Sequence, residues 1–194
     1  ASNLLGLNPS VIAVGLLQMP SFPYLSIEVP ELGPAKCIST GKAMPLKRVE
    51  NLWKKGFDIG RKLKDPLLLT ECVPGGTTTA LAILTGLGLS VGDLVSGSNR
   101  VPPMKLKNDL VAKGLATVGK SSLSSPKALL AAVGDPFQVV AIGLLLGARE
   151  AGVPVLLGGG SQMIAVLALA LETIAPKSRA SFIEDVSIGT TSWL

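Results

Sequence analysis

One segment indicates the fold more clearly than any other: Leu67-Leu-Leu-Thr-Glu-Cys-Val-Pro-Gly-Gly-Thr-Thr-Thr79. Its first five residues form an apolar run that ends in a polar residue, Glu71, as is typical of a central strand in a parallel sheet. A Pro-Gly-Gly turn follows, and the chain then continues as a predicted helix from about Thr78 to Leu84. The segment therefore predicts a strand, a loop and a helix, with Glu71 at the carboxyl end of the strand.

A second unit of the same kind lies nearer the C-terminus. Val153–Leu157 is a predicted buried strand, the residues Gly158-Gly159-Gly160-Ser161 form a loop, and Gln162–Ile174 is a predicted helix. The other predicted helices are Pro9–Gln18, Leu46–Leu63, Lys107–Ala116, Pro126–Val133 and Phe137–Ala151, and the other predicted strands are Tyr24–Val29, Ala180–Ile183 and Val186–Thr191. The alternation predicts a single α/β domain over residues 1–194, with a mostly parallel, doubly wound (Rossmann-like) sheet and helices on both faces.

The high apolar content is explained by buried strands and helices. Hydrophobic residues make up 47% of the chain, yet the longest apolar runs, Val139–Ala148 and Met163–Leu171, are much shorter than a bilayer span. We expect neither a membrane span nor a secretory signal. Cys37 and Cys72 lack metal-ligand spacing, so a reduced, cytoplasmic protein without a metal site is the simplest interpretation.

The charged residues limit the possible chemistry. The chain contains no His, so bases and zinc sites that depend on His are excluded within it, and acid–base chemistry falls to carboxylates, Lys, Cys, Tyr or main chain. The net charge of +5 is spread along the chain, and the densest basic group, Lys47 to Lys64, is interleaved with Glu50 and Asp58. A solvated helix face explains this group, and the few aromatic residues argue against nucleic-acid binding. Small phosphorylated anions are better candidate ligands.

The first Gly-rich loop is a candidate anion site. Gly75 and Gly76 lack side chains, so main-chain N–H groups can approach an anion closely, and the helix that starts near Thr77 adds its positive dipole end. Thr77, Thr78 and Thr79 provide hydroxyl groups beside these amides. The alternative is an ordinary turn in which the threonines only cap the helix.

The second loop, Gly158–Gly160 with Ser161, repeats this design, and the same alternative of a simple tight turn applies to it. Because ligands of parallel sheets bind beyond the carboxyl ends of the strands, both loops are candidate sites. Phosphate would repel Glu71 unless this residue had its own task, such as accepting a proton or orienting a cation; otherwise it is paired with a nearby Lys or Arg. Lys105 and Lys107 could reach a phosphate, although exposed lysines are more often solvated.

The stretch ECVPGGTTTALAILTGL (Glu71–Leu87) resembles the nicotinate-nucleotide–dimethylbenzimidazole phosphoribosyltransferase family, especially its uncharacterised prokaryotic branch. The resemblance extends to Asn8–Gln18, Val133–Met163 and Val186–Leu194, in consistent order. It implies a reaction in which a base nitrogen displaces nicotinate from the ribose of nicotinate mononucleotide. The product, an α-ribazole phosphate, supplies the lower ligand of cobamides, and no cofactor is needed.

The resemblance also assigns roles to residues. The family reaction passes through an oxocarbenium-like transition state. A carboxylate near the ribose would stabilise its positive charge, and tight binding of the 5′-phosphate would hold the substrate in place. Glu71 would be catalytic or would position the base. The residues that would bind the phosphate are Gly75, Gly76, Thr77 and Thr78 in the first loop, Gly159, Gly160 and Ser161 in the second, and, by a looser match, Lys107.

The sequence departs from the family in ways that matter for function. Family members are longer and carry a second functional Glu in a Gly-rich segment near their C-terminus, so we expect this chain to be incomplete, with that Glu outside it. The family's Asp-Gly-Phe element is Gly158-Gly159-Gly160 here, which leaves the acceptor base open. A homodimer is expected. Two other functions remain open: a catalytically silent nucleotide-binding homologue, and an oligomerisation domain that uses Phe137–Ala151 and Gln162–Ile174 as an apolar dimer face.

Overall fold

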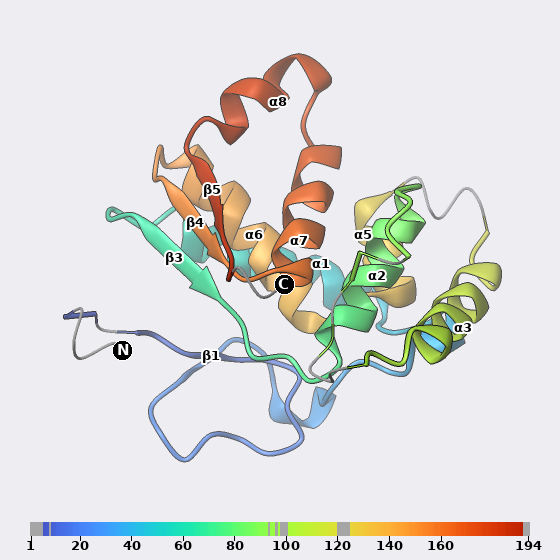
Figure 1. Cartoon of the computed structure of the whole chain (residues 1–194). Coiled ribbons are helices and arrows are strands. Elements are labelled where there is room, and N and C mark those ends of the chain that lie inside the picture. The colour runs from blue at the N-terminus through green and yellow to red at the C-terminus, as the bar shows by residue number, and fades with distance from the viewer. Residues whose placement is uncertain are drawn as a thin grey trace.

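The computed structural model describes residues 6–7, 9–92, 94–95, 97, 101–119 and 125–191, and a three-stranded parallel sheet lies at one side of its helices. Its strands are β3 (Leu67–Thr70), β4 (Val155–Gly158) and β5 (Val186–Gly189), in the spatial order β3-β4-β5 (Figure 1). The register pairs Thr70 with Gly158, and Gly158 with Gly189. The carboxyl ends of the strands therefore lie at one edge of the sheet.

Helices follow the strands as the sequence predicts. β3 leads into α2 and β4 leads into α7, which confirms both strand–loop–helix units. The helices are α1 (Leu46–Gly60), α2 (Gly76–Gly86), α3 (Met104–Ala116), α5 (Pro126–Val133), α6 (Pro136–Glu150), α7 (Ser161–Glu172) and α8 (Pro176–Ile183). Two short 3-10 helices, η2 (Pro30–Leu32) and η3 (Ile38–Thr40), lie in the segment before α1.

The N-terminal segment differs from the sequence-based expectation. Residues 9–18 were predicted to be helical, but Ile12–Ala13 form β1 and pair in parallel with β2 (Leu25–Ser26). The β-branched residues before Gly15 favour a strand, and Gly15 has a positive φ of 64°, which ends regular structure. Asn8, the residue before the predicted helix, lies outside the described residues. The predicted strand Tyr24–Val29 is confirmed only over Leu25–Ser26.

The prediction of a strand at Ala180–Ile183 was also wrong, because these residues form the second half of α8. Pro176 occupies the first turn of this helix, where its fixed φ favours helical structure and its missing N–H costs nothing. Val186–Gly189, the other candidate strand in this region, is β5. In Figure 1, α8 spans the gap between the end of α7 and the start of β5.

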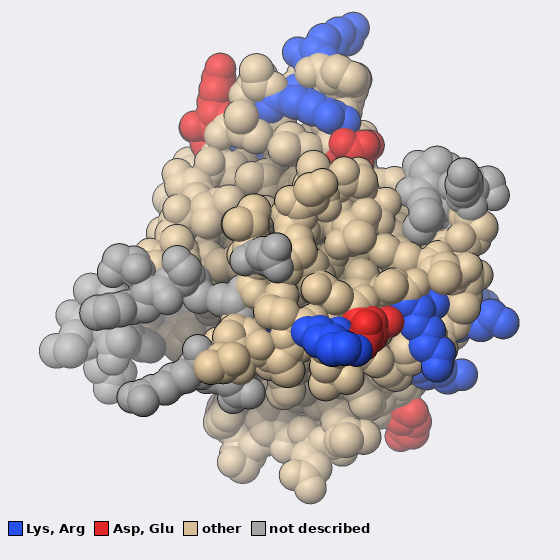
Figure 2. All heavy atoms as spheres, turned by 45° about the vertical axis from the view of Figure 1, so that its right-hand side comes forward, with Lys and Arg blue, Asp and Glu red and all other residues tan. Residues whose placement is uncertain are grey.

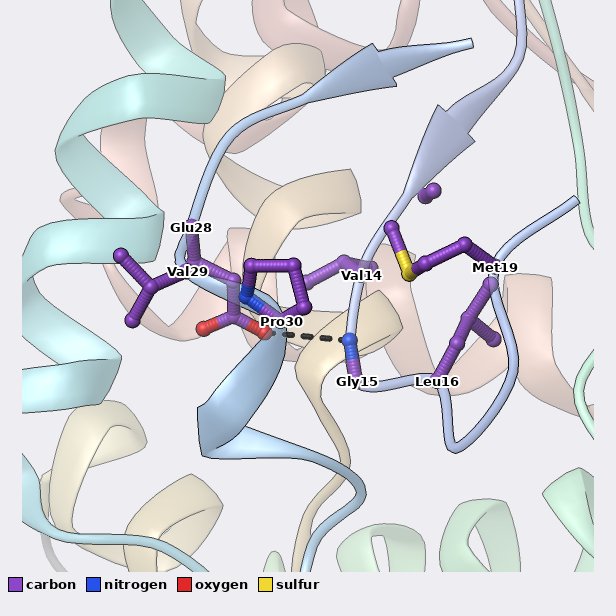
Figure 3. Close-up of a pocket in the computed structure, with 8 residues that line it drawn as sticks. Val14, Gly15, Leu16, Met19, Glu28, Val29 and Pro30 are labelled. Carbon is purple, nitrogen blue, oxygen red and sulfur yellow. Dashed lines mark hydrogen bonds between the residues drawn. The ribbon is translucent and has the colours of Figure 1, made fainter.

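A buried ion pair fastens the N-terminal segment to α1. Arg48 contacts Glu28 at 2.6 Å (Nη2 to Oε1), and both side chains are buried. The Glu28 carboxylate also accepts a hydrogen bond of 3.0 Å from the Gly15 N–H (Figure 3). The hollow beside these residues has a volume of about 10 Å³, which is room for no more than a water molecule.

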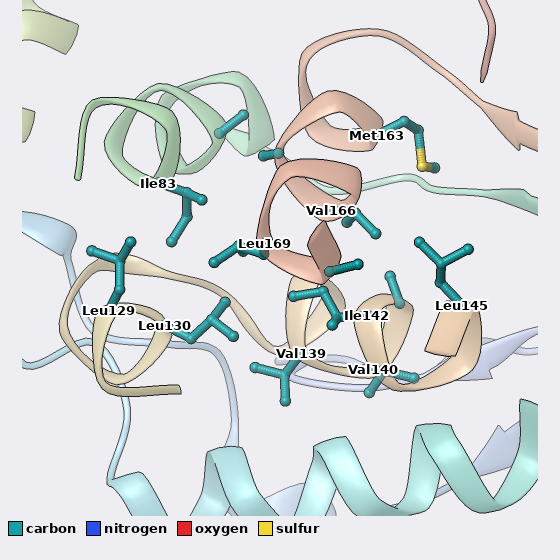
Figure 4. Packing of buried hydrophobic residues seen from close by; sticks show 14 of the residues in the cluster. Ile83, Leu129, Leu130, Val139, Val140, Ile142, Leu145, Met163, Val166 and Leu169 are labelled. Atoms are coloured by element: carbon teal, nitrogen blue, oxygen red, sulfur yellow. The ribbon is translucent and has the colours of Figure 1, made fainter. Parts of the chain in front are cut away.

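The core is built around α6, which packs along α1 and against α7 (Figure 4). Glycines make the α1–α6 contact close: a Cβ added to Gly143 would lie 2.4 Å from the Trp53 carbonyl oxygen. Most of α6 and the inner side of α7 are buried within the chain. This burial overturns the interpretation in which these two helices form an exposed dimer face.

The two faces of the sheet have different surroundings. Leu157 is fully buried on the face that packs against the helices, whereas Leu68 and Leu156 on the other face are 49% and 41% exposed. The structure thus leaves an apolar strip on one side of a parallel sheet. None of the helices within the described residues has the length and apolar character that crossing a membrane requires.

Candidate functional site

The first Gly-rich loop turns the chain from β3 into α2. Gly75 is the N-cap of α2 and has a φ of 74°, a left-handed conformation that favours glycine. Gly76 begins the helix and faces the Gln162 side chain of α7 so closely that a Cβ there would lie 2.8 Å from Nε2. Both glycines are therefore required by the local geometry, the first by the turn and the second by the close approach.

The second loop lies directly beside the first. The register of β3 and β4 places Thr70 next to Gly158, and the contact between Gly76 and Gln162 brings the starts of α2 and α7 together. Gly159 N–H donates to the Gly189 carbonyl at 2.8 Å, which ties this loop to β5 as well. The structure thus brings together the two candidate phosphate loops that the sequence predicts.

The helix N-termini at the two loops are not capped by side chains. Neither α2, which starts after Gly75, nor α7, which starts after Gly160, has a side-chain cap hydrogen bond. The same holds for α1, α3, α5 and α8, whereas Asp135 caps the neighbouring helix α6 through a capping box with Gln138. Some amides of these first turns already have main-chain partners: the Gly76 N–H donates to the Val73 carbonyl oxygen at 3.0 Å, and the Met163 N–H donates to the Gly160 carbonyl oxygen at 3.0 Å. The other first-turn amides and the positive dipole ends of both helices are suited to an anion.

The three consecutive threonines have different surroundings. Thr77 Oγ1 accepts a 2.8 Å hydrogen bond from Lys107 Nζ. Thr79 Oγ1 points into the protein and donates to Asp135 Oδ2 at 2.6 Å. Thr78 is half-buried in the first turn of α2. The hydroxyl of Thr79 is therefore committed to the interior, while Thr77 and Thr78 stay at the candidate site.

Lys107 brings a positive charge to this region from α3. Its residue is only 6% exposed, and this burial lowers the pKa of its ammonium group. Lys105, two residues earlier, points to solvent and pairs with Asp109 at 2.8 Å. The structure therefore separates the two lysines that the sequence singled out, and Lys107 is the one beside the first loop.

Glu71 lies in the loop that follows β3. Its Oε2 accepts a 2.6 Å hydrogen bond from the Val73 N–H, and within the described part of the chain it takes part in no salt bridge. Partial desolvation raises the pKa of its carboxyl group above the ordinary value, the Val73 N–H lowers it, and the negative charge of Asp135 raises it further. Such a carboxylate can accept a proton more readily than an ordinary Glu.

Sequence reasoning missed three polar residues under the loops: Asp135, Gln138 and Gln162. All three are buried and hydrogen-bonded to one another. The Asp-Pro pair at residues 135–136 signals a helix start, and Gln138 completes the Asp-x-x-Gln pattern of a capping box, but neither signal shows that these side chains meet Gln162. Gln162 directly follows the second loop, and its long-range partners left no local signal.

Other surfaces of the molecule lack the features of this region. A cleft of about 460 Å³ between η3, the start of α1 and α5 includes Lys36 and Lys42 but none of the predicted site residues. The described residues contain no cluster of His, Cys, Asp and Glu that could hold a metal ion. On the face shown in Figure 2, Lys and Arg are scattered in small groups, several beside acidic residues, rather than gathered into one basic surface.

Comparisons with known proteins agree with the resemblance seen in the sequence. The family model described as "Phosphoribosyltransferase" matches residues 4–184. A UPF0284 protein of Prochlorococcus marinus (strain MIT 9313) is 58% identical over 194 residues, which is all of this chain and 48% of the relative. A second, from Parasynechococcus marenigrum (strain WH8102), is 52% identical over 190 residues, which is 98% of this chain and 48% of the relative. The chain thus spans about half the length of these relatives.

Solved structures confirm the fold. CobT from Thermus thermophilus superposes with a TM-score of 0.73 at 23% identity, over 92% of this chain and 53% of that one. A nicotinate-nucleotide-dimethylbenzimidazole phosphoribosyltransferase from the same organism gives a TM-score of 0.72 at 23% identity, over 92% of this chain and 52% of that one. The α/β architecture with parallel strands, expected from the sequence, is therefore shared with these proteins.

Proposed function

Because the chain belongs to this phosphoribosyltransferase family, we propose that it takes part in transferring phosphoribose from nicotinate mononucleotide to a base that becomes the lower ligand of a cobamide. The observation that carries the proposal is that two helix N-termini, those of α2 and α7, lie together at Gly-rich loops, beside a buried lysine and a carboxylate of raised pKa. An anion site next to a proton acceptor suits the transfer of a phosphorylated sugar. We place this reaction in the cytoplasm.

The phosphate group would bind between the two Gly-rich loops. The amides at the starts of α2 and α7 would donate to its oxygens, and Lys107 would supply a positive charge. Gly75 and Gly76 allow the chain to approach the phosphate closely in the first loop. Ser161 and Thr78 would add hydroxyl donors, one from each helix.

Glu71 would act on the ribose and the incoming base. Departure of nicotinate leaves positive charge on the sugar carbon, and a nearby carboxylate stabilises this oxocarbenium-like state electrostatically. A base that attacks through an N–H nitrogen must also lose a proton, and the raised pKa of Glu71 favours accepting it. The residues that recognise the acceptor base, including a second functional Glu, would come from the part of a family-length protein that this chain does not span.

The proposal is tested by nicotinate release. The 194-residue chain, and in parallel a chimaera in which it replaces the matching half of the Prochlorococcus relative, would be incubated with nicotinate mononucleotide and a panel of benzimidazole, purine and phenolic bases. We expect base-dependent nicotinate release that falls at least about 100-fold in Glu71→Gln, because the variant can neither stabilise the charge nor take the proton.

Binding measurements separate the alternatives. Glu71→Gln is expected to keep its affinity for inorganic phosphate, since the substitution leaves both loops intact. Full nicotinate release by Glu71→Gln would rule out its proposed role. Binding of nicotinate mononucleotide without release, across the whole panel and in both proteins, would instead identify a catalytically silent nucleotide-binding homologue.

A further inference from the structure

Four polar side chains lie together beneath the two Gly-rich loops. Thr79 comes from the first turn of α2, Asp135 and Gln138 from the start of α6, and Gln162 from the start of α7. Asp135, Gln138 and Gln162 are each less than about a tenth exposed, and the described part of the chain has no buried side-chain N or O atom without a hydrogen-bond partner. The cluster therefore joins the N-termini of three helices through a fully satisfied polar network.

The hydrogen bonds among Asp135, Gln138 and Gln162 close a ring. The Asp135 N–H donates to Gln138 Oε1 at 3.1 Å, and Gln138 Nε2 donates to Gln162 Oε1 at 2.7 Å. Gln162 Nε2 then donates back to Asp135 Oδ2 at 3.0 Å. Outside the ring, the other carboxylate oxygen of Asp135 accepts from the Gln138 N–H at 2.9 Å, and Thr79 donates to Oδ2.

Asp135 fixes the direction of every bond in this ring. Its main-chain N–H can only donate and its carboxylate can only accept, whereas each glutamine amide has one donor end and one acceptor end. Gln138 must therefore turn its oxygen toward the Asp135 N–H, and Gln162 must turn its nitrogen toward the carboxylate. Any flip of either amide would place two donors or two acceptors against each other in the dry interior.

The ring also determines where the two loops lie. Gln162 directly follows Ser161 of the second loop, and its Nε2 lies against Gly76 of the first. Thr79 lies in the first turn of α2 and donates a hydrogen bond to the Asp135 carboxylate, which connects this turn to the ring. A shift of the first loop would break the bond between Thr79 and Asp135, and a shift of the second would break the bonds that Gln162 makes in the ring. Either shift would leave a buried polar group unpaired.

We propose that the Asp135–Gln138–Gln162 ring is the positioning device that holds the two Gly-rich loops at the separation at which both bind one phosphate group. The three residues act through the main chain of the loops and touch no substrate. The inference rests on the proposed function only in that the phosphate belongs to the substrate. Buried polar networks of this kind specify one arrangement more than they add stability, as positioning requires.

Single isosteric substitutions test the direction of the ring. In Asp135→Asn, whichever way the amides turn, one contact has a donor facing a donor. In Gln138→Glu, an acceptor faces an acceptor unless a proton is taken up. Both variants keep the volume of the side chain, so any effect comes from hydrogen bonding and charge rather than from a cavity.

The double variant Asp135→Asn/Gln138→Glu restores all three bonds of the ring, with the two bonds made by Gln162 reversed in direction. The carboxylate introduced at position 138 accepts from the residue 135 N–H and from a flipped Gln162, whose Oε1 then accepts from the new amide at position 135. The remaining amide hydrogen at position 135 donates to Thr79, which itself donates to the Gly76 carbonyl, 2.9 Å away. Net charge and volume equal those of the wild type.

Binding of inorganic phosphate to the 194-residue chain, measured by calorimetry, is the readout. We expect each single variant to bind at least about tenfold more weakly, because relieving an unpaired buried group moves the loops out of position. The double variant should return to within about threefold of the wild type. Leu129→Ala, a substitution in the core away from the loops, should lower the melting temperature without changing phosphate affinity.

Each result decides between positioning and a purely structural role. Unchanged affinity in both folded single variants would overturn the inference whatever the turnover. Should the single variants not fold, a folded double variant that still binds phosphate about tenfold more weakly than the wild type would also overturn it. No phosphate binding by the wild type would overturn both the inference and the proposed function. Phosphate binding that depends on the ring, without nicotinate release, would refute only the proposed reaction.

Discussion

Glu71 lies beside a proposed phosphate site, whose negative charge would repel its carboxylate. A salt bridge would offset this repulsion, but Glu71 takes part in none within the described residues. Desolvation and the nearby Asp135 charge make its ionised form less favourable in the folded state. The ionised Glu71 therefore lowers the free energy of unfolding, and a functional role would explain why such a carboxylate is present. Carboxyl groups whose pKa is raised by desolvation and a neighbouring charge are typical of functional sites.

The raised pKa of Glu71 predicts a pH-dependent stability difference for Glu71→Gln. Between the ordinary and the raised pKa, the folded wild type binds more protons than the unfolded chain, so its free energy of unfolding falls as pH rises through that window. In the variant, residue 71 does not titrate, so the free energy of unfolding does not decrease for this reason. We expect equal stabilities near about pH 4 and a variant more stable by roughly a few tenths of a kcal/mol near about pH 8, since solvent screens a half-exposed group.

Urea unfolding at several pH values measures this difference. Glu50→Gln, a substitution of an exposed Glu on α1, serves as the control and should show no comparable trend. A difference that shrinks toward neutral pH would contradict the assigned direction of the Glu71 pKa.

At the scale of elements, close packing between α1 and α6 depends on glycine. A Cβ at Gly143 would lie 2.4 Å from the Trp53 carbonyl oxygen and 2.8 Å from the Phe57 nitrogen, and both are main-chain atoms that cannot move aside cheaply. Ala is the better helix former by about 1 kcal/mol, so Gly143→Ala would stabilise an isolated helix. In the folded chain we expect the opposite sign, a loss of about 1–3 kcal/mol from forcing the helices apart.

Thermal or chemical unfolding checks the sign directly. Glu150→Ala, at the exposed end of the same helix, should change stability by no more than about 0.5 kcal/mol. A Gly143→Ala variant more stable than the wild type would show that the α1–α6 contact is looser than the structure has it.

Elements with local signals were predictable from the sequence, and those set by distant partners were not. The Gly-rich turns before α2 and α7 are local signals, and they located the starts of those helices from the sequence. β1 was missed because its partner strand, β2, is a separate segment. The site divides in the same way. Glu71 and the first loop lie in one local motif and the second loop in another, whereas Gln138 and Gln162 meet across 24 residues.

At the scale of the whole molecule, the exposed sheet face is the least ordinary feature. Parallel sheets are almost always covered on both faces, yet Leu68 and Leu156 are about half exposed here. The chain also spans about half the length of its relatives. We therefore expect the remainder of a family-length protein to cover this face.

Two adjacent residues of β4 make this expectation measurable. Leu157→Ala should cost about 2–5 kcal/mol in the 194-residue chain, because Leu157 is fully buried. Leu156→Ala should cost less than about 1 kcal/mol there, because its side chain is 41% exposed. In the chimaera with the remaining half of the Prochlorococcus relative, the cost of Leu156→Ala should rise toward that of Leu157→Ala. An equally small cost in the chimaera would mean that the strip stays open in the longer protein.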